Sequence, residues 1–259
     1  MATRLRFFGV SAFEITNSQG TRVLVDPYLD GNSASPIKSD DLERVDLILV
    51  THAAYDHLGD ASKIAKRFRA PVVCGVDVRT HLIKEGVAPE KLIGTIWGLV
   101  AEVVGIKVRS VESRHWSSMV EADGTYYSGP PMGFIIEPDP DVRIYHSGDS
   151  ALFSDLKLIG QLYRPNIALI NVSDTDVRQN SGPLQNSPYL TGEMTPYEAA
   201  LAAQWLGVDY VIPIHFAAVN VDVEAFLELI KNMSSDGKPH VKAVLLKPGE
   251  VFTYPEIQR

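Results

Sequence analysis

The chain has 259 residues, and its hydrophobic content of 45% is enough for a substantial buried core. Its net charge of −8 and its isoelectric point near 5.4 exclude a nucleic-acid binder that relies on a broad basic surface. The single cysteine, Cys74, can form neither an internal disulfide nor a thiolate metal cluster, so we expect a reducing, cytoplasmic environment.

The first part of the chain is predicted to form short strands joined by turns, followed by strands that alternate with helices. The turn-like segments GVS and NSQG separate the first three strands, as in a meander of hairpins. The apolar run DLILVT (46–51) is typical of a strand buried on both faces. Asp60 is a plausible N-cap for a helix over 61–68, and Gly86 ends a second helix. The predicted strands cover residues 5–9, 12–16, 22–26, 46–51 and 71–75.

The second part continues the alternation of strands and helices, which places strands in the middle and helices outside. Two long loops, 116–132 and 172–195, are expected to act as lids or binding loops. No segment has the apolar length of a signal peptide or a membrane span, and we expect one domain over 1–259. The predicted strands cover 106–113, 133–138, 142–148, 166–172, 210–216 and 241–247, and the predicted helices cover 152–163, 195–207 and 223–233.

Histidine or aspartate follows four of the predicted strands. His52, His115, Asp149 and His215 each lie at or just beyond the carboxyl end of an apolar run, where side chains from rigid elements can converge. Imidazole and carboxylate suit zinc, iron or manganese. The alternative is that each is a hydrogen-bonded structural residue. Four such positions, with the Asp-His pair at 56–57 beside the first, favour a metal site.

The polar segments THAAYDHLGD, SRHWSS, YHSGDS and VIPIHF occur in the order and spacing of a known family. The chain resembles the metallo-β-lactamase superfamily, whose signature is His-x-His-x-Asp-His, a lone His, a bridging Asp and a final His. The phrases YHSGDSALFSDLKLIGQLYRPNIALI and EMTPYEAALAAQWLGVDYVIPIHF resemble its L-ascorbate-6-phosphate lactonase-like branch. The resemblance implies an α/β fold, a four-layered αββα sandwich with the metal site at one edge between two sheets.

The resemblance also implies a role for each ligand position. One metal site would comprise Asp56, His57 and His215, with Asp149 bridging to another site that contains His52 and His115. The third histidine of that other site is absent, because Ala54 has no donor atom. We therefore predict one firmly held ion and a second that is weak, completed by water, or absent. Two alternatives are a single central ion that also uses His52 or His115, and a Tyr55 side chain that turns inward.

The predicted activity is metal-dependent hydrolysis of a lactone or another carboxylic ester, with a divalent ion that activates water. Zinc is the first choice, with manganese or iron as alternatives. Asp56 or Asp149 would hold the water and accept its proton, and His52 or His115 would shuttle protons. Asp26 would orient a ligand histidine or simply end a turn. His146 would support the site or pack in the core, and the alternative is that it binds the metal directly.

Two other functions stay open: a phosphodiesterase of the same fold, and a degenerate member that binds a ligand without turnover. The expected substrate is a small molecule, and an anionic one could pair with Arg178 in loop 172–195. No nucleic acid and no membrane partner is expected. The resemblance admits a homo-oligomer, because relatives often assemble.

Overall fold

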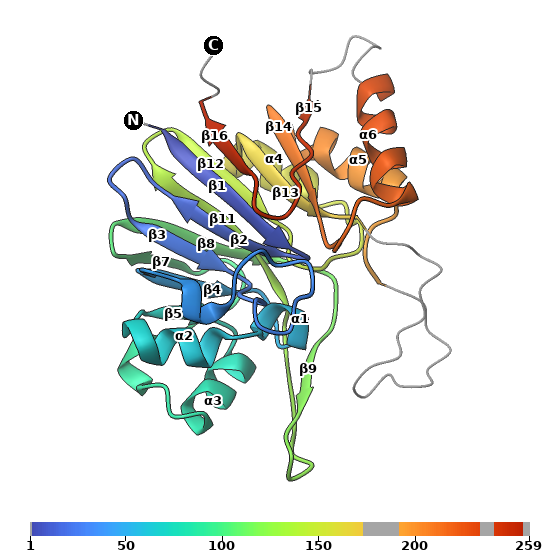
Figure 1. Cartoon of the computed structure of the whole chain (residues 1–259). Helices are drawn as coiled ribbons and strands as arrows, with labels where there is room; N and C mark the ends of the chain where they lie inside the picture. The colour runs from blue at the N-terminus through green and yellow to red at the C-terminus, as the bar shows by residue number, and fades with distance from the viewer. Residues whose placement is uncertain (1, 173–191, 234–240, 256–259) are drawn as a thin grey trace.

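The computed structural model describes residues 2–172, 192–233 and 241–255. Within these residues, two seven-stranded sheets pack face to face, and helices cover their outer faces (Figure 1). This arrangement confirms the predicted four-layered αββα sandwich. No helix among the described residues has the length and apolarity to cross a bilayer.

The first sheet has the strand order β16-β1-β2-β3-β4-β5-β6. Its first four strands are antiparallel neighbours, which confirms the meander expected at the start of the chain, whereas β3 to β6 run parallel. The strands are β1 (Thr3–Gly9), β2 (Ala12–Thr16), β3 (Arg22–Val25), β4 (Leu47–Val50), β5 (Val72–Cys74), β6 (Leu92–Gly94) and β16 (Val251–Tyr254).

The second sheet repeats this plan with the order β15-β14-β13-β12-β11-β8-β7. Strands β7, β8, β11 and β12 are antiparallel neighbours, and β12 to β15 run parallel. The strands are β7 (Val100–Val103), β8 (Ile106–Glu112), β11 (Met132–Asp139), β12 (Val142–His146), β13 (Ile167–Asn171), β14 (Tyr210–Ile214) and β15 (Lys242–Ala243).

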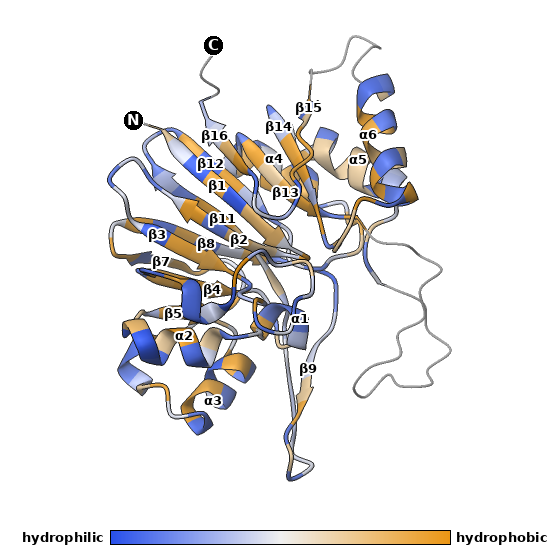
Figure 2. Ribbon diagram, viewed as in Figure 1, coloured by the Kyte–Doolittle hydropathy of each residue, from blue (hydrophilic) through white to orange (hydrophobic). Residues whose placement is uncertain are grey.

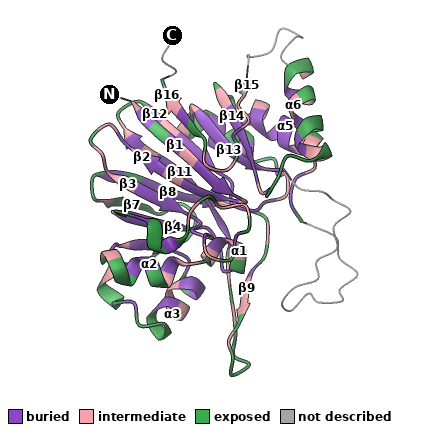
Figure 3. Ribbon diagram, in the orientation of Figure 1, coloured by how far each residue is buried: buried purple, intermediate pink, exposed green. Residues whose placement is uncertain are grey.

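Alternation along the strands divides the apolar side chains among three cores. In β4, Leu47 and Leu49 face the second sheet, while Ile48 and Val50 face the helices of the first. Figure 2 shows hydrophobic strands between the hydrophilic outward faces of α2 and α6, and Figure 3 shows the same strands buried. The helices are α1 (Tyr55–Leu58), α2 (Ala61–Phe68), α3 (Val76–Lys84), α4 (Leu156–Tyr163), α5 (Pro196–Leu206) and α6 (Val221–Met233), with short 3₁₀ turns at Ser39–Asp41 and Pro89–Lys91.

Two predicted segments differ from the structure. The segment 116–132 is not an irregular loop: β9 (Ser117–Val120) and β10 (Tyr126–Gly129) form a hairpin that projects from the body of the molecule (Figure 1). The predicted strand 241–247 is regular only over β15. Beyond β15, Leu246 packs into the core between the sheets without continuing the ladder.

A backbone connection joins the two sheets at one edge. Val10, directly after β1, donates its N–H to the carbonyl of Phe216 at 2.9 Å, and the N–H of His215 donates to the carbonyl of Val10 at 2.7 Å. The chain therefore leaves β14 against the end of β1. The edge where β4, β8, β12 and β14 all end is held together at this point.

Gly160 marks the contact between α4 and α5. A Cβ atom at this position would lie 2.6 Å from the carbonyl oxygen of Leu206 and 2.7 Å from that of Trp205, so Gly160→Ala would force the helices apart. Overpacking of this kind costs about 1–3 kcal/mol. We expect urea unfolding to show a loss of about this size. Leu162→Ala, on the exposed side of the same helix, is the control and should change stability by less than about 0.5 kcal/mol; equal effects of both variants would contradict the packing argument.

Candidate metal centre

Asp149 lies at the centre of a cluster of histidines at the joined edge of the sheets. It follows β12 and is buried, and each surrounding histidine follows the end of a strand or lies on the short helix α1. The same carboxylate oxygen, Oδ2, faces four imidazole Nε2 atoms: His57 at 3.1 Å, His215 at 3.2 Å, His52 at 3.8 Å and His115 at 3.9 Å. Four segments that are distant in sequence therefore meet at one carboxylate.

A second carboxylate joins this cluster from α1. Asp56 Oδ2 lies 3.6 Å from His215 Nε2. One donor atom each from Asp56, His57 and His215 lies within 4.8 Å of the others, and the same holds for His52, His57 and Asp149. The structure thus brings together all six predicted ligands, whereas Ala54, the N-cap of α1, adds no donor.

Asp26 fixes the orientation of the His57 ring. Register between β3 and β4 places Asp26 beside the end of β4, where its N–H donates to the carbonyl of Leu49. Its carboxylate lies 2.7 Å from His57 Nδ1 and accepts from both the N–H and the hydroxyl of Thr51 at 2.8 Å. With the Nδ1 proton donated to Asp26, the Nε2 lone pair of a neutral His57 faces Asp149.

Thr51 orients His52 in the same way. Its hydroxyl donates to Asp26, so it can only accept from His52 Nδ1, which lies 3.0 Å away. This assignment follows from the hydrogen-bond network and leaves the Nε2 of His52 without a proton. In their neutral forms, both histidines of this segment therefore turn a lone pair towards the carboxylate of Asp149.

These donors fit a divalent cation. His52 Nε2 and Asp149 Oδ1 are buried and have no hydrogen-bond partner among the described residues, and His57 Nε2 faces the Asp149 carboxylate at 3.1 Å. Buried polar atoms normally have partners, and lone pairs aimed at a carboxylate repel it unless a proton or a cation lies between them. Nitrogen and oxygen donors at this spacing suit zinc, manganese or iron.

The pKa values show how strongly the groups interact. Burial favours neutral Asp149, yet His215 and His57 hold its pKa well below the usual value. Burial would lower the pKa values of His57 and His215, but the carboxylate of Asp149 raises both well above the usual value. Binding of a cation to these two rings would therefore release the protons that the rings carry.

Close backbone contacts hold the ligand loops together. Gly148 has a φ of +56°, and a Cβ there would lie 2.9 Å from Thr51 Cβ, so the loops before Asp149 and His52 touch. A Cβ at Gly59 would lie 2.5 Å from the carbonyl oxygen of Pro27. His215 itself has a φ of +72°, a strained conformation typical of functional sites.

His146 supports the loop and is not in a position to bind the ion. Its Nδ1 accepts from the N–H of Gly148 at 3.0 Å, and its Nε2 lies 3.2 Å from the carbonyl oxygen of Ser11. Both ring nitrogens therefore have partners. The contacts of His146 support both a packing role and a supporting role. The ring packs in the core, and it positions the segment before Asp149.

Other predicted contributors lie away from the cluster or outside the described residues. Tyr55 is 64% exposed and packs edge-on against Tyr28. The alternative in which its side chain turns inward towards the metal site is therefore wrong. Trp116 donates to the hydroxyl of Tyr126 within the β9–β10 hairpin. Arg178, the residue expected to pair with an anionic substrate, lies outside the described residues.

Sequence reasoning missed Glu193. This residue is buried, and its Oε1 lies 4.0 Å from His115 Nε2. Donor atoms of His115, Asp149 and Glu193 lie within 4.8 Å of one another. Burial and the nearby Asp149 raise the pKa of Glu193 to about 7. The one signal in the sequence was an acidic residue two positions before Thr195, the N-cap of the helix that follows the second long loop.

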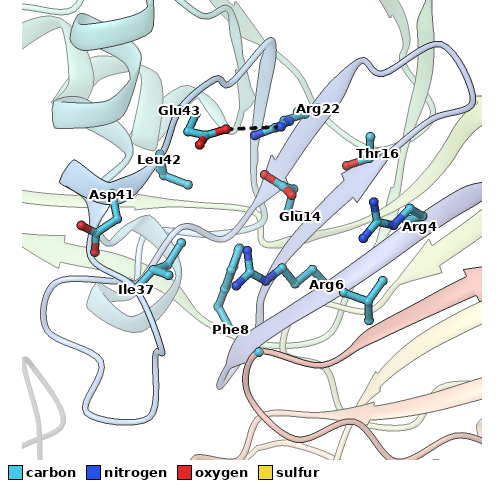
Figure 4. Close-up of a pocket in the computed structure, with 12 residues that line it drawn as sticks. Arg4, Arg6, Phe8, Glu14, Thr16, Arg22, Ile37, Asp41, Leu42 and Glu43 are labelled. Atoms are coloured by element: carbon cyan, nitrogen blue, oxygen red, sulfur yellow. Dashed lines mark ion pairs between the residues drawn. The ribbon is translucent and has the colours of Figure 1, made fainter.

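A separate cavity of about 490 Å³ lies on the outer face of the first sheet (Figure 4). Arg4, Arg6, Glu14 and Arg22 line it, and Arg22 pairs with Glu43 at 3.8 Å. None of the histidines described above is among its lining residues. The cavity is therefore distinct from the edge where the metal ligands meet.

Comparison with known proteins agrees with this geometry. The model of a β-lactamase superfamily domain matches residues 21–216. The chain belongs to the β-lactamase superfamily. Relatives named UPF0173 metal-dependent hydrolase come from Rubrobacter xylanophilus, 34% identical over 96% of this chain and 95% of the relative, and Thermococcus onnurineus, 36% identical over 96% and 98%. A metallo hydrolase from Ignicoccus hospitalis superimposes with a TM-score of 0.75 at 27% identity, covering both chains completely.

The chain accordingly belongs with relatives that are named metal-dependent hydrolases. The printed names of these relatives specify neither a lactone nor an ester. The resemblance to the lactonase-like branch therefore enters only as part of the function proposed below.

Asp26→Asn tests the support of His57. The variant exchanges the acceptor of the Nδ1 proton for an amide, so the ring should lose its fixed orientation. We expect the affinity for zinc to fall by about 10–100-fold, as for comparable outer partners of metal ligands. The measurement is calorimetric titration of metal-free protein. Asp46→Asn, which removes a carboxylate bound to the N–H of Arg22, is the control and should bind zinc like the parent; unchanged affinity in Asp26→Asn would contradict the assignment.

Proposed function

We propose that the protein hydrolyses a lactone or another carboxylic ester of small size, with zinc as the bound ion and manganese or iron as alternatives. The observation that carries the proposal is the convergence of four imidazole Nε2 atoms on one oxygen of Asp149, within 3.9 Å. In this proposal Asp56, His57, His215 and Asp149 hold the ion firmly, and His52 and His115 lie on its other side.

The ion and the residues around it would have different roles in hydrolysis. When bound, the ion supplies an acidified water and an electrophile for the carbonyl oxygen. The pKa of Asp56 is lowered to about 2, because His57 and His215 outweigh its burial, so this carboxylate is ionised and can bind the cation and orient the attacking water through a hydrogen bond. Burial lowers the pKa values of His52 and His115, so both rings stay neutral and each keeps a nitrogen lone pair that can bind a cation.

The choice of a carboxylic ester or lactone is supported by the resemblance of two long segments, 145–170 and 193–216, to the lactonase-like branch. A phosphodiester is the second substrate class, since this fold carries many chemistries. A ligand-binding member without turnover is the third reading. All six predicted donors lie in the cluster, and only Ala54 departs from the family's ligand pattern. This near-complete donor set favours an active enzyme over a binding protein.

The cellular setting is also part of the proposal. We propose a cytoplasmic setting, since the single cysteine cannot form an internal disulfide. Burial raises the pKa of the Cys74 thiol to about 12, so this cysteine is protonated and unreactive. We further propose a small-molecule substrate, anionic ones included, and assembly into a homo-oligomer. Light scattering after gel filtration tests the assembly, and a monomer at micromolar concentration would contradict it.

A substrate screen tests the proposed reaction. Metal-free protein is reconstituted with zinc, manganese or iron and offered lactones, carboxylic esters and phosphodiesters. We expect chelation to abolish turnover, zinc to restore it, and a lactone or ester to be cleaved faster than any phosphodiester. Faster phosphodiester cleavage would contradict the substrate class, and no cleavage of any compound by metal-loaded protein would favour the binding role.

His57→Ala and His215→Ala test the role of the cluster. Each variant removes one donor and leaves Asp149 without one of its two nearest imidazoles. We expect kcat/KM to fall at least about a hundredfold. One ligand supplies about a third or a quarter of the binding energy of a zinc site, and its loss lowers the affinity for zinc by about this factor. His81→Ala is the control, because His81 pairs with Glu121 beside the β9–β10 hairpin, and its kcat/KM should stay within about twofold. Full activity in either cluster variant would contradict the proposal.

A further inference from the structure

We propose that Glu193 is a ligand of a second metal position and supplies the donor that Ala54 lacks. The inference rests on the proposed metal-dependent function and adds a residue and an ion to it. The second position would be formed by His52, His115 and Glu193 and would share Asp149 with the first.

The geometry places Glu193 on the side of the cluster that the first position leaves open. Its Oε1 lies 4.0 Å from His115 Nε2, and His115 Nε2 lies 3.9 Å from Asp149 Oδ2. Donor atoms of these three residues lie within 4.8 Å of one another, the same limit that the group of Asp56, His57 and His215 meets. His52 completes this side, because its Nε2 lies 3.8 Å from Asp149 Oδ2 and its ring meets the His115 ring edge-on at 5.3 Å.

The chain around Glu193 fixes the carboxylate in this place. Met194, the next residue, is fully buried in the core beneath α5. Thr195 then caps α5, accepting from the N–H of Glu198 while the Glu198 carboxylate accepts from the N–H of Thr195. On the other side, a Cβ at Gly192 would lie 3.4 Å from His115 Nδ1, so the backbone passes close to that ring. Glu193 is thus held between a capped helix and a ligand histidine.

A cation explains why two carboxylates are buried side by side. The side chains of Glu193 and Asp149 are only 3% and 4% exposed. Two carboxylates that share a site repel each other, and burial increases the cost. A divalent ion between them would turn this repulsion into attraction. The two positions would then match, each with two imidazoles and one carboxylate of its own besides the shared Asp149.

Replacing an imidazole by a carboxylate lowers the net charge of the loaded centre by one unit. Carboxylate oxygen is a harder donor than imidazole and suits manganese and iron well. The second position would therefore admit manganese and iron besides zinc. This proposal changes the number of firmly held ions from the one expected from Ala54 to two.

Zinc titration of the full chain tests the proposal. Metal-free protein is titrated calorimetrically with Zn²⁺ alone, and bound zinc is counted by mass spectrometry after gel filtration. We expect two ions per chain in the parent and one in Glu193→Gln, which keeps the size of the side chain but not its charge. The affinity for the second ion should fall about a hundredfold, the share of one ligand in a four-ligand site. Glu193→Ala is the second variant, and circular dichroism checks that both are folded.

Two controls separate ligation from a structural role. Glu198→Gln weakens the cap of the same helix but leaves the cluster, so it should keep two ions. The double variant Ala54→His with Glu193→Ala moves the donor to α1 and should recover the second ion. One ion in the parent, or two ions of unchanged affinity in Glu193→Gln, would overturn the proposal.

The ion count is independent of the substrate. Loss of one ion in Glu193→Gln supports the role of Glu193 even if the parent cleaves no lactone, which would overturn only the proposed reaction. Lactone cleavage by a parent that holds one ion would support the reaction and overturn the role of Glu193.

Discussion

The structure depends on one buried carboxylate surrounded by imidazoles. Asp149 lies at the end of β12, where water cannot solvate its charge, and four histidine Nε2 atoms face the same oxygen. A buried charge is costly unless it is paired, so this position is stable only with protons or a cation among the rings. The raised pKa values of His57 and His215 show that protons on the two rings can balance the charge, and a divalent ion would supply the same two positive charges at one point.

The rest of the fold keeps these groups at one edge. Alternating apolar residues bury each sheet on both faces, which fixes where β4, β12 and β14 end. The loops beyond the strands touch through glycine, as at Gly148, and the sheets are tied by the hydrogen bonds of Val10 with His215 and Phe216. Asp26 and Thr51 then set which nitrogen of each ring faces the centre. Core packing, loop contacts and hydrogen bonds together therefore fix the positions and orientations of the candidate ligands.

The sequence predicted most of this arrangement, and its failures have physical reasons. Continuous apolar runs such as 46–51 and 210–216 identify buried strands, and the polar residues at their carboxyl ends are the candidate ligands that the structure brings together. The β9–β10 hairpin was missed because its strands project from the body and carry no apolar alternation. Glu193 was missed because it follows a long loop, and local pattern does not show where a loop returns to the fold. Its burial beside His115 is a property of the tertiary structure alone.

The central claim is that these distant segments hold a cation, and anomalous X-ray diffraction from zinc-loaded crystals tests it most directly. Zinc bonds to histidine nitrogen and carboxylate oxygen are about 2.0–2.2 Å long. The account predicts an anomalous peak at this distance from Asp149 and His57, inside the cluster. Zinc found only on surface side chains, with the rings of His52, His57, His115 and His215 turned away from Asp149, would contradict it.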